Sequence, residues 1–331
     1  MSQTGETGDG IGSRDVMKAI VQDRYGSPGV LELMELEQPA VNDQEVLVRV
    51  HAAAVNPLDW HFVRGQPYVA RIALGLPKPK VRVRGVDVAG HIEAVGKDVK
   101  QLHTGDEVFG WCSGAFAEYA SAAESNFAPK PANLTFEQAA GVPVAAVTAL
   151  QALRDVGKVQ PEQKVLINGA AGGVGTFAVQ IAKSFSAEVT GVCSTRNVDL
   201  VRSIGADHVI DYTKEDFTKS GQRYDLILDN AGNHSLSEFR RRLTTEGTFI
   251  ANSGASVGLT IVARALSPFV RQRLGSFLAK LNHDDLVVLK QLIEAGKVRS
   301  VIDRTYPLSQ TSEAIGYVEA GHARGKVIIT I

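Results

Sequence analysis

A glycine-rich turn at residues 169–175 is the part of the sequence whose composition points most directly to chemistry. It lies in the stretch KVLINGAAGGVGTFAVQIAK at residues 164–183, between a short apolar strand at 164–168 and apolar residues at helical spacing over 176–183. Glycines in such a turn allow positive φ, let the backbone approach a pyrophosphate and let the helix pack close to the strand. The helix N-terminus adds free N–H groups and the positive end of its dipole. The turn is therefore predicted to bind the phosphates of a nucleotide.

The segments after the turn must supply the rest of a nucleotide-binding unit, because a lone glycine motif is weak evidence. Strands are predicted at residues 187–193, 208–212, 224–229 and 247–251, with a helix at 198–204 that stops at Gly205. This alternation predicts a parallel, doubly wound sheet. The alternative is a glycine-rich turn in an α/β domain that binds nothing.

The end of the second predicted strand indicates which nicotinamide cofactor the unit prefers. Units that bind NAD usually place an acid there, about 20 residues past the glycines, against the ribose 2′-hydroxyl. This chain has Ser194, Thr195 and Arg196 instead. An arginine can pair with a 2′-phosphate that an acid would repel, so NADPH is predicted. The alternative is that Arg196 is a solvated loop residue.

Composition narrows the class of protein. The 331 residues are 44% hydrophobic and 21% charged with a net charge of −1, which predicts two globular domains and gives no reason to expect nucleic acid as a partner. Cys112 and Cys193 are the only cysteines, too few for a disulfide framework, so a reducing cytoplasm is the predicted location. Residues 1–16 are polar and glycine-rich, which predicts a disordered tail. No run approaches the ~20 apolar residues of an integral membrane segment.

Four motifs carry a family resemblance: AAAVNPLDW at 52–60, GVDVAGHIEAVG at 85–96, TGDEVFG at 104–110, and the glycine turn followed by Gln180 and Lys183. The chain resembles the zinc-independent quinone oxidoreductase branch of the medium-chain dehydrogenase/reductase superfamily. The resemblance implies an α/β protein with a GroES-like β-rich catalytic domain and a doubly wound, parallel-sheet Rossmann domain. The Rossmann domain is expected at 141–272, and the catalytic domain at 17–140 plus 273–331. A homodimer is expected as well.

The resemblance also bears on metal binding. Asn56, Asp87 and the region near Thr148 match the positions where zinc-dependent relatives hold their metal ligands. Asparagine is a poor zinc ligand and two cysteines cannot form a four-cysteine site, so no metal is predicted.

The expected reaction is hydride transfer from NADPH to a quinone or an α,β-unsaturated carbonyl compound (an enone), followed by a proton. Asn56 is predicted to orient substrate or cofactor, with Tyr68 as a possible proton donor. The alternatives are that Asn56 only stabilises the turn before Trp60 and that Tyr68 is an ordinary surface residue. An alcohol or aldehyde dehydrogenase and a non-enzymatic NADPH-binding protein remain alternative functions.

The resemblance assigns the cofactor contacts residue by residue. Thr148 is expected near the nicotinamide. The pyrophosphate is assigned to Gly172, Gly173, Val174 and Gly175, and the 2′-phosphate to Ser194, Arg196 and Tyr212. Asn230, Ser253 and Gly254 are expected at the ribose and nicotinamide because ligands collect at strand carboxyl ends. Arg324 and Lys326 are predicted to return to the phosphate, or simply to aid solubility.

Three further stretches allow predictions of local structure. Alternation at residues 45–51 predicts a strand, and the basic alternation at 78–84 predicts a half-exposed one. The basic segment at 261–281 predicts a helix-rich cover of the substrate cleft or a dimer surface, with contact to a membrane as the alternative.

Overall fold

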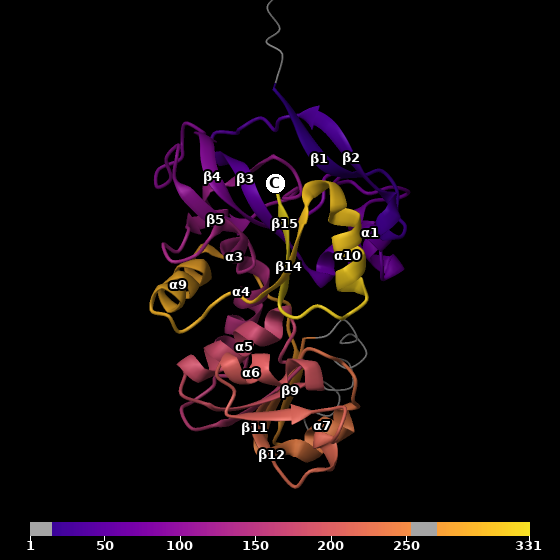
Figure 1. The fold of residues 1–331 in the computed structure, drawn as a ribbon, viewed down its shortest axis with the longest axis vertical. Coiled ribbons are helices and arrows are strands. Elements are labelled where there is room, and N and C mark those ends of the chain that lie inside the picture. Colours follow the sequence, from indigo (N-terminus) through magenta and orange to yellow (C-terminus); the bar gives the residue numbers. More distant parts are fainter. Residues whose placement is uncertain (1–14, 253–269) are drawn as a thin grey trace, which may run out of the picture.

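The computed structural model describes residues 15–252 and 270–331, and its two large sheets lie in the upper and lower parts of the molecule (Figure 1). The upper sheet has the strand order β14-β15-β3-β4-β5-β7, with β6 paired to β3. Its pairs are antiparallel except β14 with β15. The strands are β3 (Glu45–Val55), β4 (Asp87–Val95), β5 (Glu107–Trp111), β6 (Tyr119–Ala123), β7 (Phe127–Pro129), β14 (Ile302–Pro307) and β15 (Lys326–Thr330), and the separate hairpin strands are β1 (Val16–Gln22) and β2 (Leu31–Glu37).

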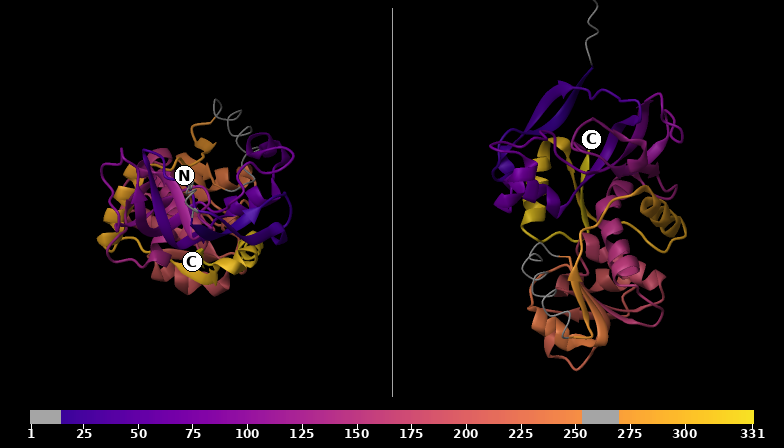
Figure 2. Two further views of the ribbon diagram at one scale, coloured as in Figure 1. Left: turned by 90° about the horizontal axis from the view of Figure 1, so that it is seen from above. Right: turned by 180° about the vertical axis from the view of Figure 1, so that it is seen from behind.

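Strand β3 brings distant parts of the sequence to one place. The predicted strand at 45–51 is confirmed, and it continues to Val55 because Ala52, Ala53 and Ala54 are fully buried between neighbouring strands. Val55 pairs with Val327 of β15, so the first residue of β15 lies beside the end of β3. Figure 2 shows the C-terminal segment returning from the lower part to lie among the N-terminal elements.

The lower sheet confirms the predicted doubly wound architecture. All its strands are parallel, in the order β10-β9-β8-β11-β12-β13. The order reverses between β8 and β11, which is where ligands bind in sheets of this kind. The strands are β8 (Lys164–Asn168), β9 (Glu188–Cys193), β10 (His208–Asp211), β11 (Tyr224–Asp229), β12 (Leu243–Ala251) and β13 (Arg273–Ser276).

The helices connect these strands and cover the sheets. The predicted helix at 176–183 begins three residues earlier, at Gly173, and the helix after β9 ends before Gly205, whose φ of +104° favours glycine. The α-helices are α1 (Pro57–Arg64), α2 (Arg71–Leu74), α3 (Phe136–Ala140), α4 (Pro143–Gln151), α5 (Gly173–Ser184), α6 (Val198–Ser203), α7 (Leu236–Arg242), α9 (His283–Glu294) and α10 (Thr311–Glu319).

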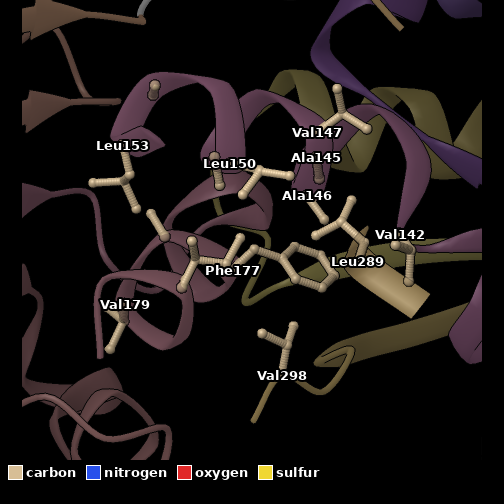
Figure 3. Packing of buried hydrophobic residues seen from close by; sticks show 14 of the residues in the cluster. Val142, Ala145, Ala146, Val147, Leu150, Leu153, Phe177, Val179, Leu289 and Val298 are labelled. Atoms are coloured by element: carbon tan, nitrogen blue, oxygen red, sulfur yellow. The ribbon is translucent and has the colours of Figure 1, made fainter. Parts of the chain in front are cut away.

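Helix α4 forms the packed layer between the two parts of the molecule. Every residue from Ala145 to Gln151 is buried, which the apolar sequence PVAAVTALQ permits because no side needs to face water. Figure 3 shows Leu150, Phe177 of α5 and Leu289 of α9 packed into one cluster, and all three are fully buried. The apolar cluster fixes α5, and with it the glycine turn, against the upper sheet.

Three predictions about local structure need correction. Residues 78–84 form no strand beyond a single bridge between Val83 and Val21, flanked by backbone hydrogen bonds from Gln22 to Arg82 and from Arg84 to Ile20. Pro79 lacks the N–H group that a strand would donate at the start of this segment. Residues 273–276 of the basic segment form β13 and pair with β12, whereas residues 253–269 lie outside the described part of the chain. The predicted boundary at 272 therefore precedes the last strand of the parallel sheet, and we propose a boundary after β13.

Candidate active site

A cavity of about 480 Å³ lies where the two parts of the molecule meet. The carboxyl ends of β8, β9 and β11 line one side, and the end of β3, the start of α1 and the start of β15 line the other. Its lining residues in the described chain include no aspartate or glutamate. The only Lys or Arg side chains among them are Arg196 and Lys326. The composition of this wall suits an anionic ligand such as a dinucleotide.

The glycine turn forms the floor of the cavity. Gly169 has φ +77°, and a Cβ on Gly175 would lie 2.1 Å from the Gly169 carbonyl oxygen, so both positions exclude a side chain. A Cβ on Gly172 would meet only ordinary contacts, and its place on the cavity wall leaves room for a ligand against the backbone. The first turn of α5 begins here with N–H groups that have no partner within the helix. These residues fit a pyrophosphate.

Ser194, Arg196 and Tyr212 line the same end of the cavity, as the sequence predicts for a 2′-phosphate site. The guanidinium of Arg196 donates to the carbonyl of His322 at 3.1 Å, and Arg324 donates to the carbonyl of Arg196 at 3.2 Å. Arg324 itself does not line the cavity, although it stands directly behind Arg196. The two guanidinium groups give this end a positive potential from both parts of the molecule.

Asp211 lies close to this end of the cavity but is not part of its lining. Asp211 ends β10, and its carboxylate accepts hydrogen bonds from the hydroxyls of Thr195 and Thr213. These bonds, led by the one from Thr195, lower the pKa of Asp211 to about 2. The carboxylate is thus held by hydroxyls that follow β9 and β10, outside the cavity lining.

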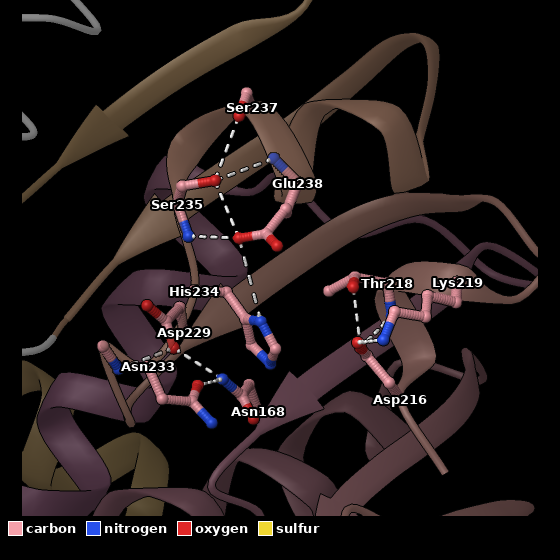
Figure 4. Close-up of polar contacts among 11 residues, drawn as sticks. Asn168, Asp216, Thr218, Lys219, Asp229, Asn233, His234, Ser235, Ser237 and Glu238 are labelled. Atoms are coloured by element: carbon pink, nitrogen blue, oxygen red, sulfur yellow. Dashed lines mark hydrogen bonds and ion pairs between the residues drawn. The ribbon is translucent and has the colours of Figure 1, made fainter.

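Asparagines gather at the strand ends on the cavity wall. Asn230, predicted from the sequence, donates to the carbonyl of Asn168 at 3.2 Å and accepts from Asn252 at 2.8 Å. Figure 4 shows Asn168 donating to Asp229 and Asn233, at 2.9 and 2.8 Å. Sequence reasoning missed Asn168, Asn233 and Asn252. A polar residue at the end of an apolar strand was the available signal for Asn168 and Asn252. The predicted Ser253 and Gly254 lie outside the described residues.

Asn56 and Lys326 lie together at the opposite end of the cavity from Arg196, which we call the inner end. Asn56 is the N-cap of α1, and the ammonium of Lys326 donates to its side-chain oxygen at 2.6 Å. The amide nitrogen of Asn56 donates to Asp87 at 2.9 Å. The prediction that Lys326 returns to the phosphate needs revision: its stem passes Gly173, but its charged end points to Asn56 because β15 pairs with β3.

Asp59 is a second buried carboxyl near this cluster. It accepts from the backbone N–H of Asn56 at 2.7 Å, but its other oxygen has no partner, and burial raises its pKa to about 7. A carboxyl with a raised folded-state pKa binds a proton that the unfolded chain releases. Its contribution to folding stability is therefore full below about pH 4 and is lost as the pH rises to about 7.

We therefore expect Asp59→Asn to flatten the pH dependence of stability. Relative to wild type, the variant should gain stability between pH 5 and pH 8, by on the order of 2–3 kcal/mol. Urea unfolding of both proteins at the two pH values measures this. An equal pH dependence in both proteins would show that Asp59 titrates normally.

The structure does not bring two predicted residues to the cavity. Tyr68 is 69% exposed and packs beside the guanidinium of Arg71, away from the cavity lining, so its loop does not present it as a proton donor. Thr148 is buried in α4, where its hydroxyl donates to the carbonyl of Val144 at 2.6 Å. Ala145, one turn earlier, lines the cavity in its place.

The donor set at the inner end does not fit zinc. Asn56 and Asp87 do lie together, but the cation beside them is the Lys326 ammonium, 3.4 Å from the Asp87 carboxylate. Burial raises the pKa of the Cys112 thiol to about 12, and zinc binds the thiolate. Within residues 15–252 and 270–331, no group of three or more His, Cys, Asp or Glu side chains could hold a metal.

Comparisons with known proteins place the chain in a family. Residues 42–132 match the model of the alcohol dehydrogenase GroES-like domain, and residues 204–329 match a model described as zinc-binding dehydrogenase. The human mitochondrial NAD(P)H oxidoreductase RTN4IP1 is 36% identical, covering 96% of this chain and 89% of that protein. The NADPH-dependent alkenal/one oxidoreductase of Arabidopsis thaliana chloroplasts is also 36% identical, with 95% and 79% covered.

A solved structure gives the same result. The quinone oxidoreductase from Coxiella burnetii superimposes with a TM-score of 0.87 at 31% identity, covering 96% of this chain and all of that one. The chain belongs to the medium-chain dehydrogenase/reductase superfamily, with a GroES-like part and a Rossmann-type parallel sheet. Within that superfamily it is an oxidoreductase that uses a nicotinamide cofactor. No helix of the described residues is long and apolar enough to cross a membrane.

Proposed function

We propose that the protein transfers hydride from NADPH to a quinone or an α,β-unsaturated carbonyl compound without a metal. NADPH is favoured over NADH because Arg196 lines the cavity and no aspartate or glutamate of the described chain does. A ribose 2′-hydroxyl is usually held by a carboxylate, whereas a 2′-phosphate pairs with arginine. The names of the Arabidopsis and Coxiella relatives support an alkenal, enone or quinone as the acceptor.

The inner end of the cavity supports the acceptor class. Oxidation of an alcohol needs a base that removes the hydroxyl proton and a cation that stabilises the resulting alkoxide. A conjugated carbonyl compound instead delocalises the charge of the incoming hydride onto its carbonyl oxygen. The bound cofactor would supply the hydride. The chain supplies a floor of backbone N–H groups, the asparagines at the strand ends and a buried ammonium. An alcohol dehydrogenase and a binding protein without turnover are the rival functions.

A substrate panel distinguishes these functions. Purified protein is analysed for zinc, and samples with and without dialysis against a chelator are then mixed with NADPH and a quinone, an enone, a saturated ketone or an aldehyde. We expect far less than one zinc per chain and NADPH oxidation with the quinone and enone alone. Stoichiometric zinc with chelator-sensitive turnover of the ketone or aldehyde would establish the dehydrogenase. Tight NADPH binding without any turnover would indicate the binding protein.

Location and assembly are separate proposals. The two cysteines are buried and unpaired with each other, which supports a reducing compartment, and we propose the cytoplasm. The human and Arabidopsis relatives carry mitochondrial and chloroplastic names, so fractionation of the source cells is the deciding measurement. We also propose a homodimer, on the resemblance to this superfamily. Sedimentation of the purified protein at two concentrations tests it.

A further inference from the structure

Lys326 is the buried cation at the inner end of the cavity, and the proposed function assigns it no particular step. It is 2% exposed, in contrast to most lysines, which keep their charge in water. Its ammonium lies 2.6 Å from the side-chain oxygen of Asn56, 3.4 Å from the Asp87 carboxylate and 3.5 Å from the carbonyl oxygen of Val55. Asn56, Val55 and Lys326 all line the cavity.

The donors of Lys326 are not used up by these partners. An ammonium has three N–H groups, and here one makes a short bond to Asn56 while two make long ones, at 3.4 and 3.5 Å. Asn56 has less freedom, because its nitrogen donates to Asp87 at 2.9 Å and its oxygen accepts from Lys326 at 2.6 Å, so both ends of the amide make short bonds. Of the Asn56 and Lys326 side chains, Lys326 is therefore the one that can direct an N–H group toward a ligand in the cavity.

Asn56 and Asp87 hold that ammonium in place. The Asn56 amide has its oxygen toward the cation and its nitrogen toward the anion, so opposite charges fix its orientation. The second oxygen of Asp87 accepts from the backbone N–H of Val144 at 2.9 Å. A buried charge that is paired and hydrogen-bonded keeps a strong field, because no water screens it.

We propose that the Lys326 ammonium acts as the electrophile of the active site and donates a hydrogen bond to the carbonyl oxygen of the acceptor. It would take the place that the metal cation has in zinc-dependent relatives. The inference rests on the proposed function and deepens it by naming the residue that receives the developing charge. Asn56 and Asp87 are positioning residues, because they act through Lys326. This role replaces the predicted return of Lys326 to the phosphate.

The step balances without a further reactant. As hydride adds its electron pair to the β-carbon, the C=C π pair moves toward the carbonyl carbon and the carbonyl π pair moves to oxygen. Lys326 donates a hydrogen bond to that oxygen and then its proton, which gives a neutral enol and a neutral amine. Water returns a proton to the amine, and the enol becomes the saturated ketone. For a quinone, hydride and the same proton give a tautomer of the hydroquinone. Water then removes the proton from the carbon that received the hydride and another water protonates the second oxygen, which gives the aromatic hydroquinone.

The decisive variant separates this role from simple charge pairing. Lys326→Met alone leaves Asp87 buried and unpaired, so it can fail to fold for a structural reason. Lys326→Met/Asp87→Asn removes both charges and is expected to recover stability. Asp87→Asn alone keeps the ammonium and controls for loss of the carboxylate. Lys130→Met removes another buried lysine, paired with Glu107 at 3.1 Å, outside the cavity lining.

Three measurements are made on each protein: thermal stability, NADPH affinity, and kcat with an enone. We expect the double variant to melt near wild type and bind NADPH within about threefold. Its kcat should fall about 100-fold or more below that of Asp87→Asn, the usual effect of removing one donor to an oxyanion. Lys130→Met should lose stability without such a fall. A double variant with kcat within tenfold of Asp87→Asn would overturn the inference.

A spectroscopic probe tests Lys326 even if no enone is reduced. 4-Nitrophenol imitates an enol, and its phenol and phenolate forms absorb at different wavelengths. We expect wild type to bind the phenolate in preference and the double variant to bind the phenol, if at all. Identical bound spectra in the two proteins would also overturn the inference. Wild-type protein that selects the phenolate but reduces no quinone or enone would refute the proposed function alone.

Discussion

Gly173→Val is expected to abolish NADPH binding while leaving a folded protein. Gly173 is the first residue of α5 and lines the cavity where the helix N-terminus meets the space for a pyrophosphate. A Cβ there would lie 3.3 Å from the side chain of Lys326, so a branched residue cannot turn away from the cavity without displacing that lysine. Its methyl groups would occupy the space that a diphosphate needs against the backbone N–H groups.

The measurement is NADPH titration, with circular dichroism as the check on folding. We expect a loss of at least 100-fold in affinity, about 3 kcal/mol, since several charge-assisted hydrogen bonds are removed together. Gly221→Val is the matched control, because a Cβ at Gly221 meets nothing within 4 Å and the residue lies outside the cavity lining. Normal NADPH binding by Gly173→Val would show that the phosphates lie elsewhere.

Arg196→Ala is expected to weaken NADPH by about 1–3 kcal/mol while leaving NADH within about twofold. The two cofactors differ only in the 2′-phosphate, so a selective loss reports on that group alone. Arg196 is exposed, so the loss should shrink as salt is raised. Arg324 remains behind it and keeps part of the positive potential.

Dissociation constants for both cofactors at two salt concentrations give the answer. Arg202→Ala removes a charge at the end of α6, outside the cavity lining, and controls for the general potential of the protein. Equal losses of NADPH and NADH in Arg196→Ala would place the 2′-phosphate away from Arg196. Equal losses of NADPH in the two arginine variants would reduce the role of Arg196 to net charge.

The sequence predicted the parallel sheet because its signals are local. The glycine turn, the apolar strand before it and the helix after it are adjacent in the chain, and β9 and β11 are likewise each followed by an α-helix. Arg196 could be proposed for the same reason, since it follows a strand of that sheet, whereas Tyr212 was assigned by the family resemblance. Ligand-facing residues collect at such strand ends.

The inner end of the site depends on contacts that no local pattern contains. Lys326 reaches Asn56 only because β15 pairs with β3, and a basic residue at the start of a C-terminal strand gives no sign of its burial. Tyr68 fails as a candidate for the converse reason. Its loop has no periodic pattern to orient it, and the side chain proves to be exposed beside Arg71. β13 was missed because its four residues, RLGS, are too short and polar to predict a strand.

Transfer of deuterium from NADPH that carries deuterium at both C4 positions of the nicotinamide tests the central claim most directly. The chelator-treated protein is incubated with the labelled cofactor and an enone, and the product is analysed by mass spectrometry and NMR. The account predicts one deuterium per product molecule, at the β-carbon of a saturated ketone. Deuterium on the carbinol carbon of an allylic alcohol, or no labelled product at all, would contradict it.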